Sequence, residues 1–252
     1  MDNMSKLINQ EEEGEGMRVY HLTYSPEVRT ACLHFHGCNF RCSFCVRRGN
    51  PYDVHLRRPP SAPLRFLGLE EVLALLERAG ARRVILLGGE PTLDPELPAL
   101  LGELRERGMA VRLLTNGYGL GEEVLEGVDE ICVSLKAYTP SLHRRVTGGD
   151  NRRVLENLRR ILSRSLPLSV ESVYVPGLVE GEEVERIARF LSSLDPGIPY
   201  HLDALLPPDE RWRAPSPEEV EEAARRAGRY LRRVTFLTGR EEPRYGTVSL
   251  FP

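Results

Sequence analysis

The sequence is almost without lysine: Lys6 and Lys136 are two among 34 basic residues, and arginine fills the other positions. It also lacks any run of about 18 apolar residues and an N-terminal basic-then-apolar pattern, so neither a membrane span nor a secretion signal is expected. The net charge of -3 gives no basic excess for non-specific binding to nucleic acid. These absences predict a cytoplasmic protein with no membrane partner.

Cysteine is scarce too, and its distribution is uneven. Of five cysteines, Cys38, Cys42 and Cys45 fall within eight residues, a pattern unlike the paired cysteines of a small disulfide-bonded domain. The spacing C-x3-C-x2-C lets a tight loop present three thiolates to one metal centre. Iron-sulfur clusters usually take four cysteines, so three ligands leave one coordination position open.

A structural zinc site is the alternative reading of this motif, with His36 or His55 as the fourth ligand. Structural zinc sites usually have pairs of cysteines spaced as C-x2-C, however, and three residues separate Cys38 from Cys42. The spacing therefore favours an iron-sulfur cluster with an open position.

Strand and helix signals alternate along most of the chain. Residues 1–16 are polar and acidic and predict a disordered tail, which leaves 17–252 as a single domain with the cysteine loop near 37–48. Six strand-helix units follow from Thr30, and such alternation is typical of parallel strands with helical crossovers. The expected fold is a partial (β/α)6 TIM-like barrel, with an open wound sheet as the other option. The expected parallel strands span 30–36, 83–87, 110–114, 129–135, 168–175 and 199–205.

Distinctive residues stand where these predicted strands end, the edge at which parallel α/β folds place their functional groups. They are Gly88, Gly89 and Glu90 after the second strand, Asn116 after the third, Ser134 and Lys136 at the fourth, and His201 on the sixth. Each has an ordinary explanation as well: a strand-to-helix turn for the glycines, a surface position for Lys136, and a core histidine for His201.

The cysteine motif, with the aromatic Phe44 just before its last cysteine, resembles the signature of the radical S-adenosylmethionine (SAM) superfamily. The resemblance implies a [4Fe-4S] cluster on three cysteines, SAM bound at the open iron, and a 5′-deoxyadenosyl radical that abstracts hydrogen. It also implies an external electron donor such as ferredoxin or flavodoxin, and an anaerobic setting.

The resemblance further implies a SAM-binding role for the residues at the strand ends. Gly88, Gly89 and Glu90 correspond to a segment that binds the amino group of SAM, and Lys136 to a lysine that contacts its carboxylate. Asn116 and Ser134 are expected at the methionine or ribose part, and His201 at the adenine or ribose. Phe44 is expected beside the cofactor.

Within the superfamily, the chain resembles the glycyl-radical-enzyme activating enzymes, such as the one that activates pyruvate formate-lyase. The matching segments are Phe-His-Gly-Cys at 35–38, Leu-Leu-Thr-Asn-Gly at 113–117 and Val-Tyr-Val-Pro-Gly at 173–177. Such enzymes abstract hydrogen from a glycine of a partner protein. Leu114 and Ser134 stand where activating enzymes commonly have aspartates, so their monovalent cation site is not expected here.

A small-molecule substrate, as in 7-carboxy-7-deazaguanine synthase, is the alternative. The sequence has no second cysteine group for an auxiliary cluster like that of the molybdopterin-precursor synthases. The arginines Arg47, Arg48, Arg57 and Arg58 could face an acidic partner, a phosphate-bearing substrate or, by default, solvent.

Overall fold

A computed structural model describes residues 16–56 and 65–251 of the chain. The predicted disordered tail falls on residues that lie, except for Gly16, outside this part, as do Arg57 and Arg58. None of the described helices is both long and apolar enough to cross a bilayer.

The core of the fold is one sheet of nine strands, in the order β8-β7-β6-β5-β4-β3-β2-β1-β9. The strands are β1 (Val19–Ser25), β2 (Thr30–Phe35), β3 (Arg83–Gly88), β4 (Ala110–Thr115), β5 (Glu130–Ser134), β6 (Leu168–Tyr174), β7 (Tyr200–Ala204), β8 (Val234–Leu237) and β9 (Val248–Phe251). Strands β2 to β8 run parallel, whereas β1 pairs antiparallel with β2 and with β9. The six predicted parallel strands are confirmed, and β8 continues the parallel sheet.

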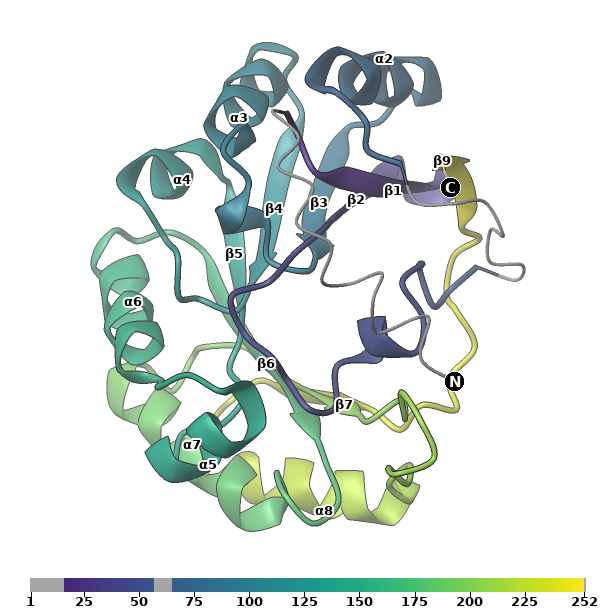
Figure 1. The fold of residues 1–252 in the computed structure, drawn as a ribbon. Coiled ribbons are helices and arrows are strands. Elements are labelled where there is room, and N and C mark those ends of the chain that lie inside the picture. Colours follow the sequence, from purple (N-terminus) through teal and green to yellow (C-terminus); the bar gives the residue numbers. More distant parts are fainter. Residues whose placement is uncertain (1–15, 57–64, 252) are drawn as a thin grey trace.

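Helices cover the outer side of the curved sheet (Figure 1). They are α2 (Leu69–Ala79), α3 (Leu97–Glu106), α4 (Glu122–Gly127), α5 (Pro140–Thr147), α6 (Arg152–Ser163), α7 (Gly181–Leu194) and α8 (Pro217–Ala227), with 3-10 turns η1 (Pro26–Val28), η2 (Val46–Arg48) and η3 (Pro91–Leu93). Helix α6 shows why they pack there: Val154, Leu158 and Ile161 recur at helical spacing and are buried. The arrangement is the predicted partial barrel.

The alternation of side chains along each parallel strand separates two environments. On β7, Tyr200, Leu202 and Ala204 belong to the hydrophobic core, while His201 and Asp203 between them point to the opposite, concave face and are half-buried. The concave face of the barrel is therefore polar here, although the outer face of the sheet is apolar.

Two elements escaped the sequence prediction. Helix α5 has only Leu142 and Val146 as aliphatic side chains in its eight residues, too few for a recognisable periodic pattern. Its ends nevertheless carry ordinary signals, Pro140 in the first turn and Gly148 in a left-handed conformation after the last. Strand β9 lies in what was expected to be a tail and pairs with β1, a long-range contact that no local pattern encodes.

Candidate functional site

The cysteine loop follows β2 and runs across the mouth of the barrel toward α5 (Figure 1). Two backbone hydrogen bonds fix it to the end of α5: the amide of Arg41 donates to the carbonyl of Thr147 at 2.8 Å, and that of Ser43 to Val146 at 3.0 Å. The missed helix α5 is thus the support on which the loop rests.

Phe44 anchors the same loop from inside. Its ring is 4% exposed and packs in a small cluster with Val146, Val175, Val179 and Leu205, with Trp212 edge-on at 6.2 Å between ring centroids. The aromatic residue between Cys42 and Cys45 is therefore a packing residue of the loop in this structure.

Replacing Phe44 with alanine is expected to lower the free energy of unfolding by about 3 kcal/mol, because it removes a large buried apolar side chain that holds the loop down. Urea denaturation measures this. Phe66→Ala is the matched control, since Phe66 is 43% exposed and should cost less than about 1 kcal/mol. Equal losses in the two variants would contradict the anchoring role.

The three thiols lie in a partly buried environment, with Cys38 exposed and Cys42 and Cys45 half-buried. Burial raises the pKa of the Cys38 thiol to about 11 and also raises the pKa of Cys42. The positive charge of Lys136 acts in the opposite direction on Cys42 and favours its thiolate. Since the thiolate is the form that binds iron, Lys136 assists ligation at this site.

Lys136 is placed by its own interactions at the centre of the site. Its ammonium donates to the hydroxyl of Ser134 at 2.5 Å. Burial alone would lower its pKa, but negative charge at Cys42, Glu171, Cys45 and Cys38 raises it. The lone lysine of the described chain is therefore close enough to interact electrostatically with the three cysteines, and their charge favours its protonated form.

Gly88 and Gly89 have a packing reason to be glycine. A Cβ on Gly89 would lie 1.9 Å from the carbonyl oxygen of Gly37, and one on Gly88 would lie 2.7 Å from backbone atoms of Phe35. Gly88 also has a φ of 115°, which favours glycine. The two glycines let the start of the cysteine loop lie directly against the end of β3.

Glu90 is 1% exposed, and its carboxylate is fully engaged. One oxygen accepts hydrogen bonds from Thr115 Oγ1 and Thr92 Oγ1, each at 2.6 Å, and the other accepts from the amide of Asn116 at 2.7 Å. Burial raises the pKa of Glu90, while these hydrogen bonds oppose the rise. The carboxylate ties the end of β3 to the end of β4.

Asn116 links that junction to the cysteine loop. Its amide nitrogen donates to Asn39 Oδ1 at 2.7 Å and lies 3.7 Å from the sulfur of Cys38. Gly88, Gly89, Glu90 and Asn116 therefore gather around the first cysteine, and Ser134 joins Lys136. Asn39 was missed by the sequence reasoning, although its position beside Cys38 was a usable signal.

His201 lies on the concave face near the amino end of β7, where it is the second residue of the strand, and not at the carboxyl end, where the sequence predicted it. Its ring bonds to Thr235 Oγ1 at 2.7 Å and to Asp203 Oδ1 at 3.1 Å, and Asp203 raises its pKa. Glu171 is a second residue that the sequence reasoning missed. In the sheet register it lies next to His201 of β7 on one side and next to Ser134 of β5 on the other. The structure thus connects His201 to the Lys136 region through Glu171.

The geometry gives the zinc alternative no support. Among the described residues, no three His, Cys, Asp or Glu side chains converge on one metal position. His55 is hydrogen-bonded to Asp53 at 2.9 Å, and His36 packs against Phe66. A [4Fe-4S] cluster places its thiolates on different irons and needs no such convergence, so the three neighbouring cysteines with Lys136 fit it better than a single ion.

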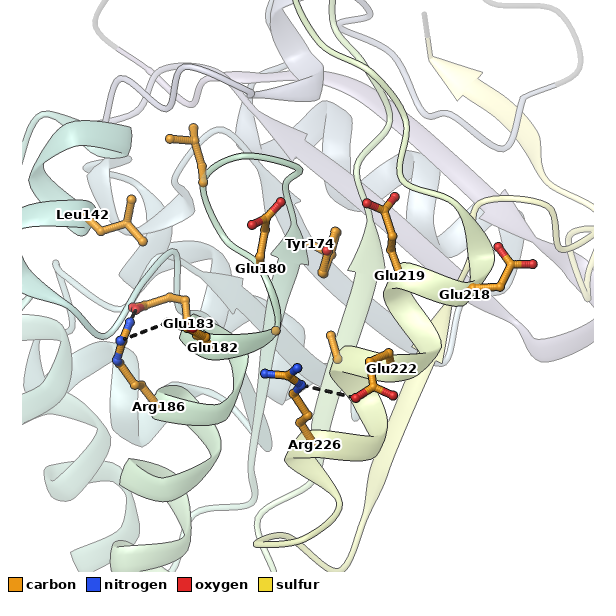
Figure 2. Close-up of a pocket in the computed structure, with 13 residues that line it drawn as sticks. Leu142, Tyr174, Glu180, Glu182, Glu183, Arg186, Glu218, Glu219, Glu222 and Arg226 are labelled. Carbon is orange, nitrogen blue, oxygen red and sulfur yellow. Dashed lines mark hydrogen bonds and ion pairs between the residues drawn. The ribbon is translucent and has the colours of Figure 1, made fainter.

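A pocket of about 600 Å³ lies apart from the cysteines, between the beginnings of α7 and α8 (Figure 2). Glutamates dominate its wall, and Arg186 and Arg226 pair with some of them. The six glutamates of the wall are Glu180, Glu182, Glu183, Glu218, Glu219 and Glu222. Such a wall repels the carboxylate of SAM, so this pocket is distinct from the cofactor site expected at the cysteines.

Comparison with known proteins gives one family and several relatives. The sequence pattern of the Radical SAM superfamily matches residues 32–191. A Methanocaldococcus jannaschii protein, provisionally named a glycyl-radical enzyme activating enzyme, is 30% identical over 214 residues, which cover 82% of this chain and 78% of that protein. GTP 3′,8-cyclase of Peptoclostridium acidaminophilum is 28% identical over 75% of this chain but only 55% of its own length.

Among solved structures, a domain of pyruvate-formate lyase-activating enzyme from Bacteroides vulgatus superposes with a TM-score of 0.53 and 24% identity. The match covers 61% of this chain and 98% of that domain. At this identity the likeness shows the fold, which agrees with the partial barrel described above.

Proposed function

Since this chain belongs to the radical SAM superfamily, we propose that Cys38, Cys42 and Cys45 hold a [4Fe-4S] cluster at which SAM binds. The observation that carries the proposal is that the loop bearing the three cysteines lies against Asn116 and the Gly88-Gly89 backbone at the ends of β4 and β3, with the charge of Lys136 acting on the thiols. When bound, the cluster and SAM supply a 5′-deoxyadenosyl radical for hydrogen abstraction.

The chain's own residues would hold and orient these groups. Lys136 favours the thiolate of Cys42 and offers a cation to the SAM carboxylate, and Ser134 fixes the lysine. Asn116 and the Gly88-Gly89 backbone form the wall next to Cys38, and Glu90 keeps that wall in place. His201 lies further down the concave face, where it would meet the nucleoside part or the substrate.

We further propose that the radical is destined for a glycine of a partner protein, so that the chain acts as a glycyl-radical-enzyme activating enzyme. The M. jannaschii relative supports this, because the similarity extends over most of both proteins. A small-molecule substrate is the second candidate, and the GTP 3′,8-cyclase relative, aligned over about half its length, favours it.

Anaerobic reconstitution tests the first level of the proposal. The protein should bind iron and sulfide in equal amounts, and dithionite with SAM should give 5′-deoxyadenosine. Zinc without sulfide would overturn it.

The activase assignment is tested with a glycyl-radical enzyme that is encoded in the source genome and labelled with α-dideuterated glycine. Deuterium should enter 5′-deoxyadenosine, and a glycyl radical signal should appear. Absence of such an enzyme or of transfer, or product formation from GTP, would overturn the activase assignment.

Lys136→Arg is expected to weaken SAM binding about tenfold, because the planar guanidinium cannot occupy the half-buried space of an ammonium bonded to Ser134. Equilibrium binding of SAM to the reconstituted protein measures it. Iron content serves as the internal control, since the cysteines are untouched. Unchanged affinity would show that the lysine is not a SAM contact.

A further inference from the structure

Five exposed arginines lie on the cysteine loop and on the two helices that follow each other beside it. Arg41 lies within the loop, and Arg144 and Arg145 lie on α5, against which the loop is hydrogen-bonded. Arg152 and Arg153 begin α6, directly after α5. All five are exposed, and we call them the arginine face.

Acidic residues are absent from the sequence segments around Arg41, Arg144 and Arg145, although Glu183 of α7 accepts hydrogen bonds from Thr139 at the start of α5. Residues 37–52 and 131–149 contain no Asp or Glu at all. The acids nearest in sequence to the start of α6 are Asp150, which pairs with Arg152 at 4.0 Å, and Glu156, one turn further along the helix. Arg41, Arg144 and Arg145 have no ion pair among the described residues, so their charge is available to a partner.

The arginine face is also directly connected to the cysteines. The guanidinium of Arg153 lies 5.0 Å from the centre of the Tyr118 ring, and Tyr118 contacts Phe40 edge-on at 5.8 Å. Phe40 stands between Cys38 and Cys42, and its amide lies 3.4 Å from the sulfur of Cys38. A protein that docks on these arginines therefore comes within two aromatic rings of the first cysteine.

A pocket of opposite charge borders the same helix, since Leu142 of α5 is one of its lining residues. The pocket between α7 and α8 is lined by the six glutamates shown in Figure 2, against two arginines. An acidic protein would be repelled there and attracted to the arginine face, so the charge distribution orients it.

We propose that the arginine face is the docking surface for an acidic one-electron carrier protein that reduces the cluster. The inference rests on the proposed function, in which the site must receive an electron for each SAM cleaved. In the docked complex the carrier's own cofactor loses one electron and the cluster gains that electron. The electron count therefore balances without a further reactant.

The test measures docking directly, with an acidic flavodoxin as the probe. The double variant Arg144→Glu with Arg145→Glu should bind flavodoxin about tenfold more weakly than the wild type at low salt, and the difference should shrink as ionic strength rises. Arg78→Glu with Arg82→Glu is the matched control. Both control residues are exposed and lie near the amino end of β3, at the other end of the barrel, so this variant should bind like the wild type.

A chemical reductant separates docking from catalysis. With dithionite, which needs no docking surface, the Arg144/Arg145 variant should form 5′-deoxyadenosine at the wild-type rate, whereas reduced flavodoxin should support it more slowly. The docking proposal would be overturned if flavodoxin binding were weakened equally in both double variants, or if it were weakened in neither. Failure of the wild type with dithionite would overturn the proposed function, while the binding comparison would still decide the docking surface.

Arg144 and Arg145 also stabilise the carboxyl end of α5 through the helix dipole, so folding needs its own check. Circular dichroism reports whether the reversed variant is folded. If it is not, Arg41→Gln with Arg145→Gln removes two charges without adding repulsion and should still weaken flavodoxin binding several-fold. Binding at the wild-type level by that folded variant would overturn the proposal.

Discussion

Cys42→Ala is expected to abolish cluster assembly and SAM cleavage, with iron and sulfide content and 5′-deoxyadenosine formation each falling by about 100-fold or more. Cys42 is the thiol on which Lys136 acts most strongly, and it lies half-buried at the centre of the three-cysteine loop. No other cysteine is near enough in sequence to replace it. Anaerobic reconstitution followed by metal, sulfide and product analysis measures the loss.

Cys32→Ala is the control, because it makes the same chemical change in β2, the strand that leads into the loop. Cys32 lies within β2, outside the C-x3-C-x2-C motif, and burial raises the pKa of its thiol to about 12. The variant should keep its iron and its activity. Retention of a full cluster by the Cys42 variant, or its loss from the Cys32 variant, would contradict the ligand assignment.

The parallel sheet could be predicted because each strand-helix unit carries its own local signal. Helix α2 carries such a signal over its whole length of 69–79, since its apolar residues follow the helical period and Gly80 ends it. Helix α5 has too few apolar residues for that signal, and β9 depends on a partner more than 200 residues away. Prediction failed where the stabilising contacts are tertiary.

The candidate site could likewise be predicted only in part. Spacing pointed to the cysteines, and scarcity pointed to Lys136, whose charge interacts with them in the structure. Phe44 and Glu90 were also singled out, but sequence alone could not tell a residue that touches a ligand from one that holds the wall. The structure shows the supporting role: Phe44 packs in an apolar cluster, and the hydrogen bonds of the Glu90 carboxylate run to the adjoining strand ends. Contact of either residue with SAM stays a prediction.

Gly89→Ala is expected to lower the free energy of unfolding by about 3 kcal/mol and to reduce iron binding with it. The new Cβ would meet the carbonyl oxygen of Gly37 at 1.9 Å and its carbonyl carbon at 2.8 Å, and backbone cannot rotate aside as a side chain can. The loop start must move, which breaks the 2.8 Å hydrogen bond from the amide of Glu90 to Gly37 and displaces Cys38.

Gly102→Ala provides the matched control for this steric argument. Gly102 is exposed within α3, and a Cβ added there would meet no atom within 4 Å, so alanine should stabilise the protein by about 0.5 to 1 kcal/mol. Urea denaturation compares the two variants, and iron content after reconstitution reports on the cysteine loop. A stable Gly89 variant with a full cluster would show that the loop can yield without cost. Loss of stability together with iron would instead support the positioning of the first cysteine by backbone contact with the end of β3.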